Sequence, residues 1–324
     1  MLNQVTEKIL KGEKITKTEA LTIIKCNVTD LCLSVDKIKQ KFCGNKIDLC
    51  SIISGRGGNC SENCKFCAQS KYHSTGAECY SFLDEDVIVE DCKKHRDAGI
   101  HRYSIVTAGR ALGGTDFKKA VSAYSKMHSQ CNNISLCASH GLLSYEQFKE
   151  LKNSGVNRYH CNIETSESYF KNICTTHSFK DKIDTINSAK KAGLEICSGG
   201  IIGMGETMED RIDMAFTLAE LNVNSIPINV LNPIKNTPLE NEKPLSEEEI
   251  LKTIAIFRFI NPKADIRMAA GRNKLKNNGI DAFKSGANST ITGDFLTTTG
   301  STIKMDKDMF VNNGFDISTI KEDN

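Results

Sequence analysis

ISLCASHGLLSYEQFKELKNSGVNRYHCNIET, residues 134–165, holds a short apolar run, a helical pattern and a second short run in direct succession. Within residues 144–155 the apolar side chains recur every three or four positions, as on one face of an α-helix. The flanking runs, 134–140 and 158–165, have the length and composition of buried strands. No hairpin turn joins them, so the stretch predicts two parallel strands connected by a helix.

The same alternation continues on both sides of this stretch. The other candidate strands are residues 48–55, 102–109, 195–203, 225–233, 264–271 and 288–294, and further helical patterns span 180–193, 208–221 and 246–259. Eight strand–helix units in series predict an α/β fold, a (β/α)8 barrel of the TIM type. An open, doubly wound sheet remains an alternative, because periodicity does not reveal whether the sheet closes.

We expect the 324 residues to form a single domain with three parts. Residues 1–45 are predicted to form N-terminal helices, one of them opened by a capping box at Thr16 and Glu19. Residues 46–300 form the barrel and 301–324 a polar C-terminal tail.

Composition excludes several classes of protein. There is no apolar run long enough for a membrane helix and no signal sequence at the N-terminus, so we expect a cytoplasmic protein without a membrane partner. The net charge of +2 does not favour nucleic acid, and we expect none to bind. In a reducing compartment, 14 cysteines are better explained as metal ligands, catalytic groups or core residues than as disulfides.

Three of these cysteines, Cys60, Cys64 and Cys67, follow the first candidate strand with the spacing C-x3-C-x2-C. In such barrels the active residues lie at the carboxyl ends of strands and on the loops that follow. Structural zinc needs four ligands, and the nearest candidates, His73 and Cys79, lack a paired spacing. Three thiolates on a four-iron cluster leave one iron open for a substrate or cofactor. Zinc binding and a purely structural role remain alternatives.

The motif, with Phe66 before its last cysteine, resembles the cluster motif of the radical S-adenosylmethionine (SAM) enzymes. Further stretches, in the same order, resemble the biotin synthase family: GNCSENCKFCAQS (58–70), EICSGGIIGMGET (195–207), SIPINVLNPIKNTPL (225–239), IRMAAGR (266–272) and GANSTITGD (286–294). The resemblance covers about residues 45 to 300.

The resemblance implies a radical SAM enzyme with two clusters. A [4Fe-4S] cluster on Cys60, Cys64 and Cys67 would bind SAM and cleave it to a 5′-deoxyadenosyl radical that removes hydrogen from dethiobiotin. An auxiliary iron–sulfur cluster, [2Fe-2S] or a larger variant, would supply the sulfur that makes biotin. The expected partners are dethiobiotin, a small electron-transfer protein such as flavodoxin or ferredoxin, and a second copy in a homodimer.

Carried over by position, the auxiliary cluster would be held by Cys137, Cys197 and Arg267. The family's remaining cysteine belongs in the second strand, where this chain has Ser104. Serine is a poor replacement for thiolate on iron, because it is harder and seldom deprotonated. The site is therefore rebuilt or held by fewer cysteines.

Cys161 and Cys174 are the nearest spare thiols that could act with, or instead of, Ser104. Strand alternation argues against Cys161, because it faces the helices if its neighbour Asn162 faces the lumen.

Other positions are assigned by the same resemblance. Asn162 and Asn229 match residues that hydrogen-bond the ureido ring of dethiobiotin, and amides offer both a donor and an acceptor to a urea. Glu164 matches the acid that binds the SAM ribose, while Thr107 and Ile201 match residues that line SAM.

Two alternative functions remain. A related radical SAM maturase or mutase would keep the motif cysteines and Glu164 but would not need Cys137, Cys197 and Arg267 together. A structural protein that binds zinc or iron would need only the motif.

Overall fold

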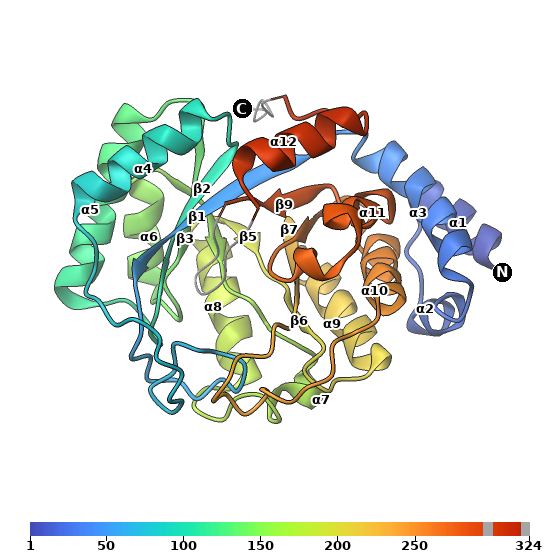
Figure 1. The fold of residues 1–324 in the computed structure, drawn as a ribbon, viewed down its shortest axis with the longest axis horizontal. Coiled ribbons are helices and arrows are strands. Elements are labelled where there is room, and N and C mark those ends of the chain that lie inside the picture. Colours follow the sequence, from blue (N-terminus) through green and yellow to red (C-terminus); the bar gives the residue numbers. More distant parts are fainter. Residues whose placement is uncertain (294–300, 319–324) are drawn as a thin grey trace.

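The computed structural model describes residues 1–293 and 301–318. Its centre is one parallel sheet that runs from β5 through β4, β3, β2, β1, β9, β8 and β7 to β6 and closes where β5 pairs with β7 (Figure 1). The strands are β1 Asp48–Arg56, β2 Arg102–Thr107, β3 Ser135–Ser139, β4 Val156–His160, β5 Glu195–Cys197, β6 Gly200–Ile202, β7 Ser225–Val230, β8 Asp265–Met268 and β9 Ser289–Ile291. The predicted barrel is confirmed and the open sheet is excluded. The end of the last predicted strand, residue 294, lies outside the described residues.

The predicted strand 195–203 is divided into β5 and β6, which together fill the fifth position of an eight-membered barrel. A Cβ atom on Gly199 would lie 2.0 Å from the carbonyl oxygen of Pro227, and one on Gly200 would lie 2.2 Å from that of Glu164. Neighbouring backbone therefore approaches the break too closely for any side chain.

Helices surround the barrel (Figure 1). They are α4 Glu85–Asp97, α5 Gly114–Gln130, α6 Tyr145–Asn153, α7 Glu167–Phe170, α8 Phe179–Lys191, α9 Met208–Glu220, α10 Glu247–Ile260 and α11 Ile280–Lys284, with 3-10 turns η1 Arg272–Lys274 and η2 Asn277–Gly279. Capping boxes open α6, α8, α9 and α10, where a Ser or Thr side chain and the third helical residue bond each other's backbone. Of the described helices, none has the length and hydropathy to cross a membrane.

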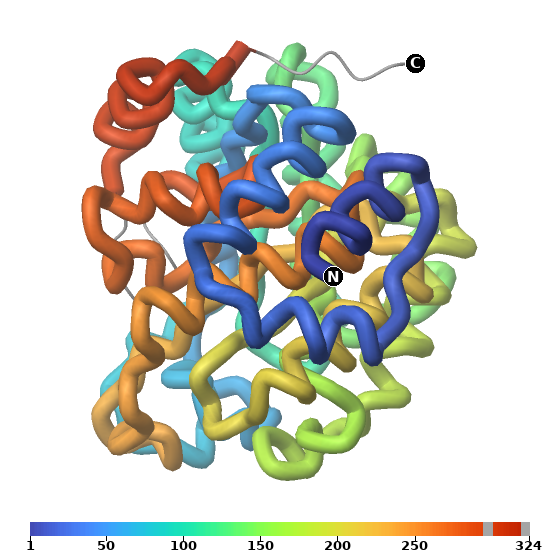
Figure 2. Tube along the Cα trace, turned by 90° about the vertical axis from the view of Figure 1, so that its right-hand side faces the viewer, coloured from blue at the N-terminus to red at the C-terminus, as the bar shows by residue number. Residues whose placement is uncertain are grey.

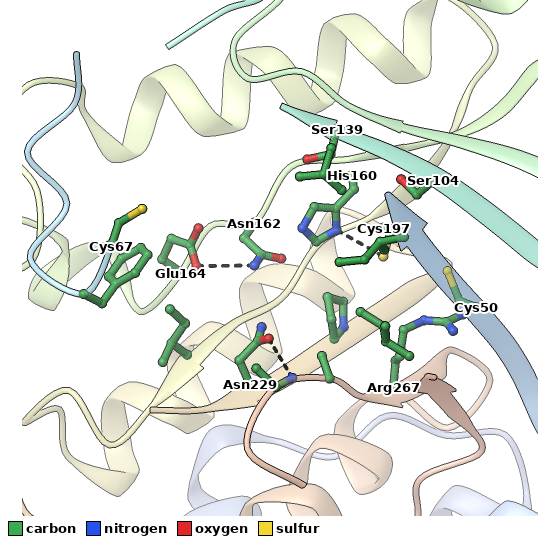
Figure 3. Close-up of a pocket in the computed structure, with 18 of the residues that line it drawn as sticks. Cys50, Cys67, Ser104, Ser139, His160, Asn162, Glu164, Cys197, Asn229 and Arg267 are labelled. Carbon is green, nitrogen blue, oxygen red and sulfur yellow. Dashed lines mark hydrogen bonds between the residues drawn. The ribbon is translucent and has the colours of Figure 1, made fainter. Parts of the chain in front are cut away.

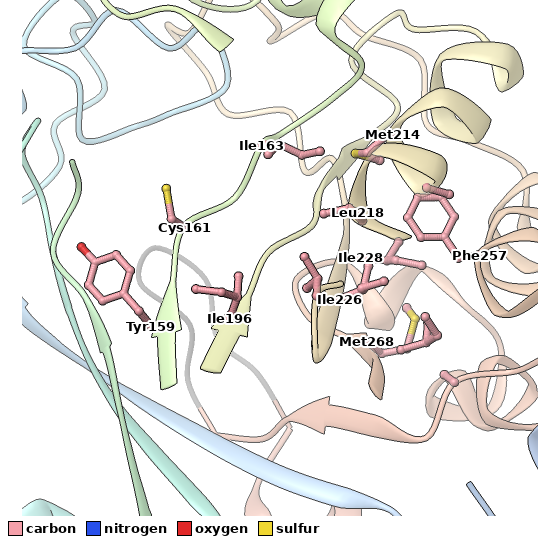
Figure 4. Packing of buried hydrophobic residues seen from close by; sticks show 14 of the residues in the cluster. Tyr159, Cys161, Ile163, Ile196, Met214, Leu218, Ile226, Ile228, Phe257 and Met268 are labelled. Atoms are coloured by element: carbon pink, nitrogen blue, oxygen red, sulfur yellow. The ribbon is translucent and has the colours of Figure 1, made fainter. Parts of the chain in front are cut away.

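The hydrophobic core lies between the barrel wall and the helices (Figure 4). Alternate residues of each strand point outward, so Ile226 and Ile228 of β7 pack toward Leu218 of α9 and Phe257 of α10. The other residues of each strand point into the barrel, and many of these inward positions carry polar or sulfur-bearing side chains.

The N-terminal helices are α1 Leu2–Leu10, α2 Lys17–Ile23 and α3 Val28–Phe42, and they pack on the outside of the barrel (Figure 2). The capping box at Thr16 and Glu19 is confirmed. Lys39 of α3 donates a hydrogen bond of 2.6 Å to the carbonyl oxygen of Phe283 in α11, which ties these helices to the barrel.

The tail contains α12 Ile303–Asn312. Phe310 of α12 packs against Phe283 edge-on, with ring centroids 4.7 Å apart. Beyond the helix, the backbone of Asp316 forms a parallel β-bridge with that of Lys46, just before β1. Residues 301–318 of the tail therefore cover the amino end of β1.

Candidate active site

The barrel encloses a cavity of about 360 Å³. Its walls are inward-facing side chains from every strand, and the loop after β1 contributes Phe66, Cys67 and Gln69 (Figure 3). The cavity thus joins the carboxyl ends of the strands, where barrel enzymes carry their active residues, to the barrel interior.

The motif cysteines lie on residues 57–80, here called the cluster loop, between β1 and α4. The Cys60 N–H donates to the Gln69 carbonyl at 2.8 Å, and the Cys67 N–H donates to the Cys64 carbonyl at 3.0 Å. At Gly58 φ is +71°, and a Cβ atom would lie 2.4 Å from the Cys79 sulfur, so only glycine fits where the loop doubles back. Cys67 lines the cavity, whereas Cys60 and Cys64 lie outside its lining.

Cys64 has a sulfur neighbour that sequence spacing could not reveal. Its Sγ lies 3.7 Å from that of Cys174, which in turn lies 3.3 Å from Nδ1 of His177. His177 also lies 2.5 Å from the carboxylate of Glu62. Hydrogen bonds from the Cys64 thiol and from His177 lower the pKa of Cys174 to about 3. Cys174 therefore lies beside the cluster loop and away from Cys137 and Cys197.

Within the described part of the chain, Cys64, Cys174 and His177 are the one group of three ligand atoms that all lie within 4.8 Å of one another. Two sulfurs and one imidazole suit zinc. Since Cys64 belongs to both sets, a zinc ion there and a complete cluster on the motif exclude each other.

The inner part of the cavity contains Cys137 of β3, Cys197 of β5 and Arg267 of β8, all buried. Arg267 donates to Asp48 at 2.7 Å. His160 lies 3.4 Å from the Cys197 sulfur. Burial acts to raise the pKa of Cys197, but the charge and hydrogen bond of His160 outweigh it and bring the pKa to about 7.

Ser104 lines the same cavity and lies in register with Cys137 on the neighbouring strand. Cys161 lies elsewhere: it is buried in the apolar core beside Tyr159 and Ile196, outside the cavity lining (Figure 4). We therefore do not retain Cys161 as a ligand, and strand alternation explains its orientation.

Cys50 and His160 also line the cavity, and sequence reasoning missed both. Cys50 lies in β1, and burial raises the pKa of its thiol to about 12, against the opposing charge of Arg267. The signal that could have found it is in the sequence: inward residues of alternate strands form common layers in such barrels, and the first strand has its cysteine in DLCSIISG.

Asn162 and Glu164 follow β4 and lie between Cys67 and the inner thiols (Figure 3). Glu164 has a φ of +70°, unusual for a residue with a side chain, and its backbone is held by a bridge to Gly200. The Asn162 side chain accepts from the Gly199 N–H at 3.0 Å and donates to Glu164 at 3.3 Å. The close backbone contact at Gly200 thus positions both side chains.

Asn229 of β7 is fixed in the same way. Its amide donates to the Gly200 carbonyl and accepts from the Ala270 N–H, each at 3.1 Å. Ile201 lines the cavity, whereas Thr107 lies outside the lining, with its hydroxyl 3.0 Å from Nδ1 of His140.

Two family models match the chain, the radical SAM superfamily over residues 56–218 and the biotin and thiamin synthesis associated domain over residues 227–316. A biotin synthase of Clostridium beijerinckii is 57% identical over 317 residues, which cover 98% of this chain and 100% of that protein. A biotin synthase of Alkaliphilus metalliredigens is 56% identical over 97% of this chain and 99% of its own length.

The chain belongs to the biotin synthase family. It is a radical SAM enzyme of biotin synthesis that acts by sulfur insertion, and a related maturase or mutase is not favoured. Membership in the biotin synthase family implies a [4Fe-4S] cluster and SAM as cofactors, and dethiobiotin fits the family as the substrate.

Solved structures confirm the fold alone. A methylornithine synthase superposes with a TM-score of 0.84 at 19% identity, over 98% of this chain and 97% of that one. An FeFe-hydrogenase maturase from Carboxydothermus hydrogenoformans superposes with a TM-score of 0.79 at 16% identity, over 97% of this chain and 78% of that one.

Proposed function

We propose that dethiobiotin binds in the barrel cavity and is converted there to biotin, between a [4Fe-4S] cluster at the mouth and an auxiliary iron–sulfur cluster at the inner end. One observation carries the proposal. A single cavity has Cys67 at one end, Cys197 and Arg267 at the other, and two asparagine amides between them (Figure 3), and Cys137 also lines it.

Cys60, Cys64 and Cys67 would hold the first cluster, and Cys137, Cys197 and Arg267 would hold the auxiliary cluster, of two irons or more. When bound, the first cluster with SAM would supply the radical chemistry for removing hydrogen from substrate carbons, and the auxiliary cluster would supply sulfur. The protein's part is to enclose the reacting atoms. The barrel wall and the cluster loop surround the cavity and keep water and oxidisable side chains away.

Asn162 and Asn229 orient the substrate through its ureido ring. Each amide already donates one N–H and accepts one hydrogen bond, Asn229 with backbone groups and Asn162 with the Gly199 N–H and the Glu164 carboxylate. The second N–H and the second lone pair of each amide are left for a neutral urea. Because both amides are pre-positioned, little ordering is needed on binding.

Glu164 accepts hydrogen bonds from the SAM ribose, with Ile201 against the cofactor from β6 and Thr107 near it from the end of β2. Burial raises the pKa of Glu164, while the positive charge of Lys182 opposes that shift. Hydroxyl donors from a ribose would stabilise the carboxylate in this half-buried place.

A small protein such as flavodoxin or ferredoxin supplies electrons to the mouth, where Cys60 and Cys64 lie outside the cavity lining. The homodimer and the single-domain organisation of residues 1–324 stay predictions, and light scattering of the holoprotein would check the first.

The test is an anaerobic assay of reconstituted protein with SAM, reductant and dethiobiotin, measuring biotin and 5′-deoxyadenosine. Asn229→Ala removes a half-buried hydrogen-bonding group of the cavity wall, which is worth about 1–3 kcal/mol once substrate covers it, so dethiobiotin binding should weaken roughly ten- to a hundredfold. Unchanged affinity would point to another substrate. A colourless protein with one zinc per chain would exclude the proposed reaction.

A further inference from the structure

The thiols of the inner cavity lie on alternate strands. Cys50 is on β1, Cys137 on β3 and Cys197 on β5, while Arg267 is on β8, the seventh position of the barrel. All four side chains are buried and line the cavity. In an eight-stranded barrel of the TIM type, four residues from alternate strands form one layer of the interior.

Strand register shows that these four do form one layer. The hydrogen-bond register from β1 across β2 to β3 aligns Cys50 with a β3 residue. That residue lies two positions before Cys137. The same step of two residues leads through β4 from Cys137 to Cys197, and through β7 from Cys197 to Arg267. The same step of two residues also leads through β9 from Arg267 back to Cys50. The four equal steps therefore return to the starting residue, and their sum is the register shift expected of an eight-stranded barrel of this type.

Ser104 belongs to a different layer. It lies on β2, an even position, and its register partners are Cys137 on β3 and Ile52 on β1, two residues beyond Cys50, so it lies between that layer and the mouth. The cysteine that would complete a set of three with Cys137 and Cys197 is therefore Cys50.

The residues around the layer suit a negatively charged cluster. Arg102 and Arg158 lie below it on β2 and β4, and Arg267 is within it. Arg102 and Arg267 share the buried carboxylate of Asp48, at 3.1 and 2.7 Å. Among the described residues, the buried Nη1 atom of Arg158 has no hydrogen-bond partner. Thiolates and sulfide would complement these positive charges.

The distances between the thiols also favour binding of a cluster of several atoms over binding of a single metal ion. Of the described residues, only the Cys64 group at the mouth brings three ligand atoms within 4.8 Å of one another. The Cys50, Cys137 and Cys197 thiols are therefore too far apart to meet that spacing, although all three line one cavity.

We propose that Cys50 is the third thiolate ligand of the auxiliary cluster, together with Cys137, Cys197 and Arg267, and replaces the cysteine that this chain lacks at Ser104. The proposal rests on the proposed function for the existence of the cluster. In this arrangement the third cysteine ligand is on the first strand instead of the second, and all four ligands belong to one layer of the barrel.

The experiment counts auxiliary iron separately from that of the motif. In a full-length chain with Cys60, Cys64 and Cys67 all changed to Ala, anaerobic reconstitution should load the auxiliary site alone, measured as iron and sulfide per chain and by Mössbauer spectroscopy. Adding Cys50→Ala should remove nearly all of that iron, and adding Cys137→Ala should do the same. Adding Ser104→Ala should leave it unchanged. Cys161→Ala, which removes a buried core thiol outside the cavity, controls for general destabilisation and should also retain the iron.

With the motif intact, Cys50→Ala should keep SAM cleavage to 5′-deoxyadenosine and lose biotin formation at least a hundredfold. Retention of auxiliary iron in Cys50→Ala, or its equal loss in Ser104→Ala, would overturn the ligand assignment. A wild-type chain that loads iron at both sites but makes no biotin would instead contradict the proposed function.

Discussion

At the scale of single residues, the three motif cysteines differ in their surroundings. Cys67 faces the cavity, whereas Cys64 lies beside Cys174 and His177. That neighbourhood raises the question of which thiols the radical cluster needs, because Cys174 is close enough to compete for a metal bound to Cys64.

We predict that SAM cleavage depends on Cys64 and not on Cys174. Cys64→Ala removes one of three cluster ligands and should abolish the formation of 5′-deoxyadenosine. Cys174→Ala removes a thiol only 3.7 Å away and should keep at least half of the activity. Loss of cleavage in Cys174→Ala, or its survival in Cys64→Ala, would show that the cluster uses another ligand set. Product is measured by chromatography under reducing, anaerobic conditions.

His140 is a buried histidine at the end of β3, bonded to the hydroxyls of Thr107 and Tyr124. Burial lowers its pKa to about 3. An exposed histidine has a pKa of about 6.5, so below that pH the unfolded chain binds a proton that the folded chain does not. The contribution of His140 to stability is therefore complete above pH 6.5 and declines as the pH falls toward 3.

Between pH 7 and 5.5, the free energy of unfolding of the wild type should fall by about 1 kcal/mol more than that of His140→Gln, which has no titrating ring. Denaturant titrations of the anaerobic holoproteins at both pH values measure the difference. Parallel loss of stability in the two proteins would mean that the ring is protonated as easily in the folded state.

At the scale of elements, the break between β5 and β6 organises the site. The backbone of Gly200 lies against the Glu164 carbonyl, and the same segment accepts or donates bonds to Asn162 and Asn229. One irregular strand position therefore sets three side chains that face the cavity.

Gly200→Ala should disturb all three. The new methyl group would lie 2.2 Å from the Glu164 carbonyl oxygen, so the backbone must move. Crowding of this kind costs about 1–3 kcal/mol of stability, and we expect SAM binding to weaken at least tenfold. Gly113→Ala is the matched control, since a Cβ atom there has nothing within 4 Å. Equal SAM affinity in the two variants would show that the close contact does not position Glu164.

At the scale of the whole molecule, the two family models meet between residues 218 and 227, inside the barrel. The sheet crosses that point twice, because β5 pairs with β7 and β1 pairs with β9. Neither part can complete a closed sheet alone, which supports a single domain.

Limited proteolysis tests this organisation. Residues 221–224 join α9 to β7 and include the exposed Asn222 and Asn224. If the chain is one domain, cleavage there should not leave a stable fragment of residues 1 to about 222, since its strand edges and apolar faces would be unpaired. Accumulation of such a fragment, followed by mass spectrometry, would indicate two separable units.

The sequence alone was sufficient for the series of strand–helix units, the cluster motif and the family resemblance, whereas it left open whether the sheet closes into a barrel. Helical and strand periodicities are local, so the strand–helix units and the capping box at Thr16 and Glu19 were recognised along the chain. The C-x3-C-x2-C spacing is also local, and strand alternation alone argued that Cys161 faces the helices.

Only the tertiary structure decided which distant residues meet. Closure and stagger of the sheet place Cys50 in one layer with Cys137 and Cys197, and they bring Cys174 to Cys64 across more than a hundred residues. Contacts of this kind depend on how every strand is shifted against its neighbour, and no local pattern records that shift. The physical reason is that hydrogen-bond register between strands, rather than the composition of any one strand, determines the height of a side chain in the barrel.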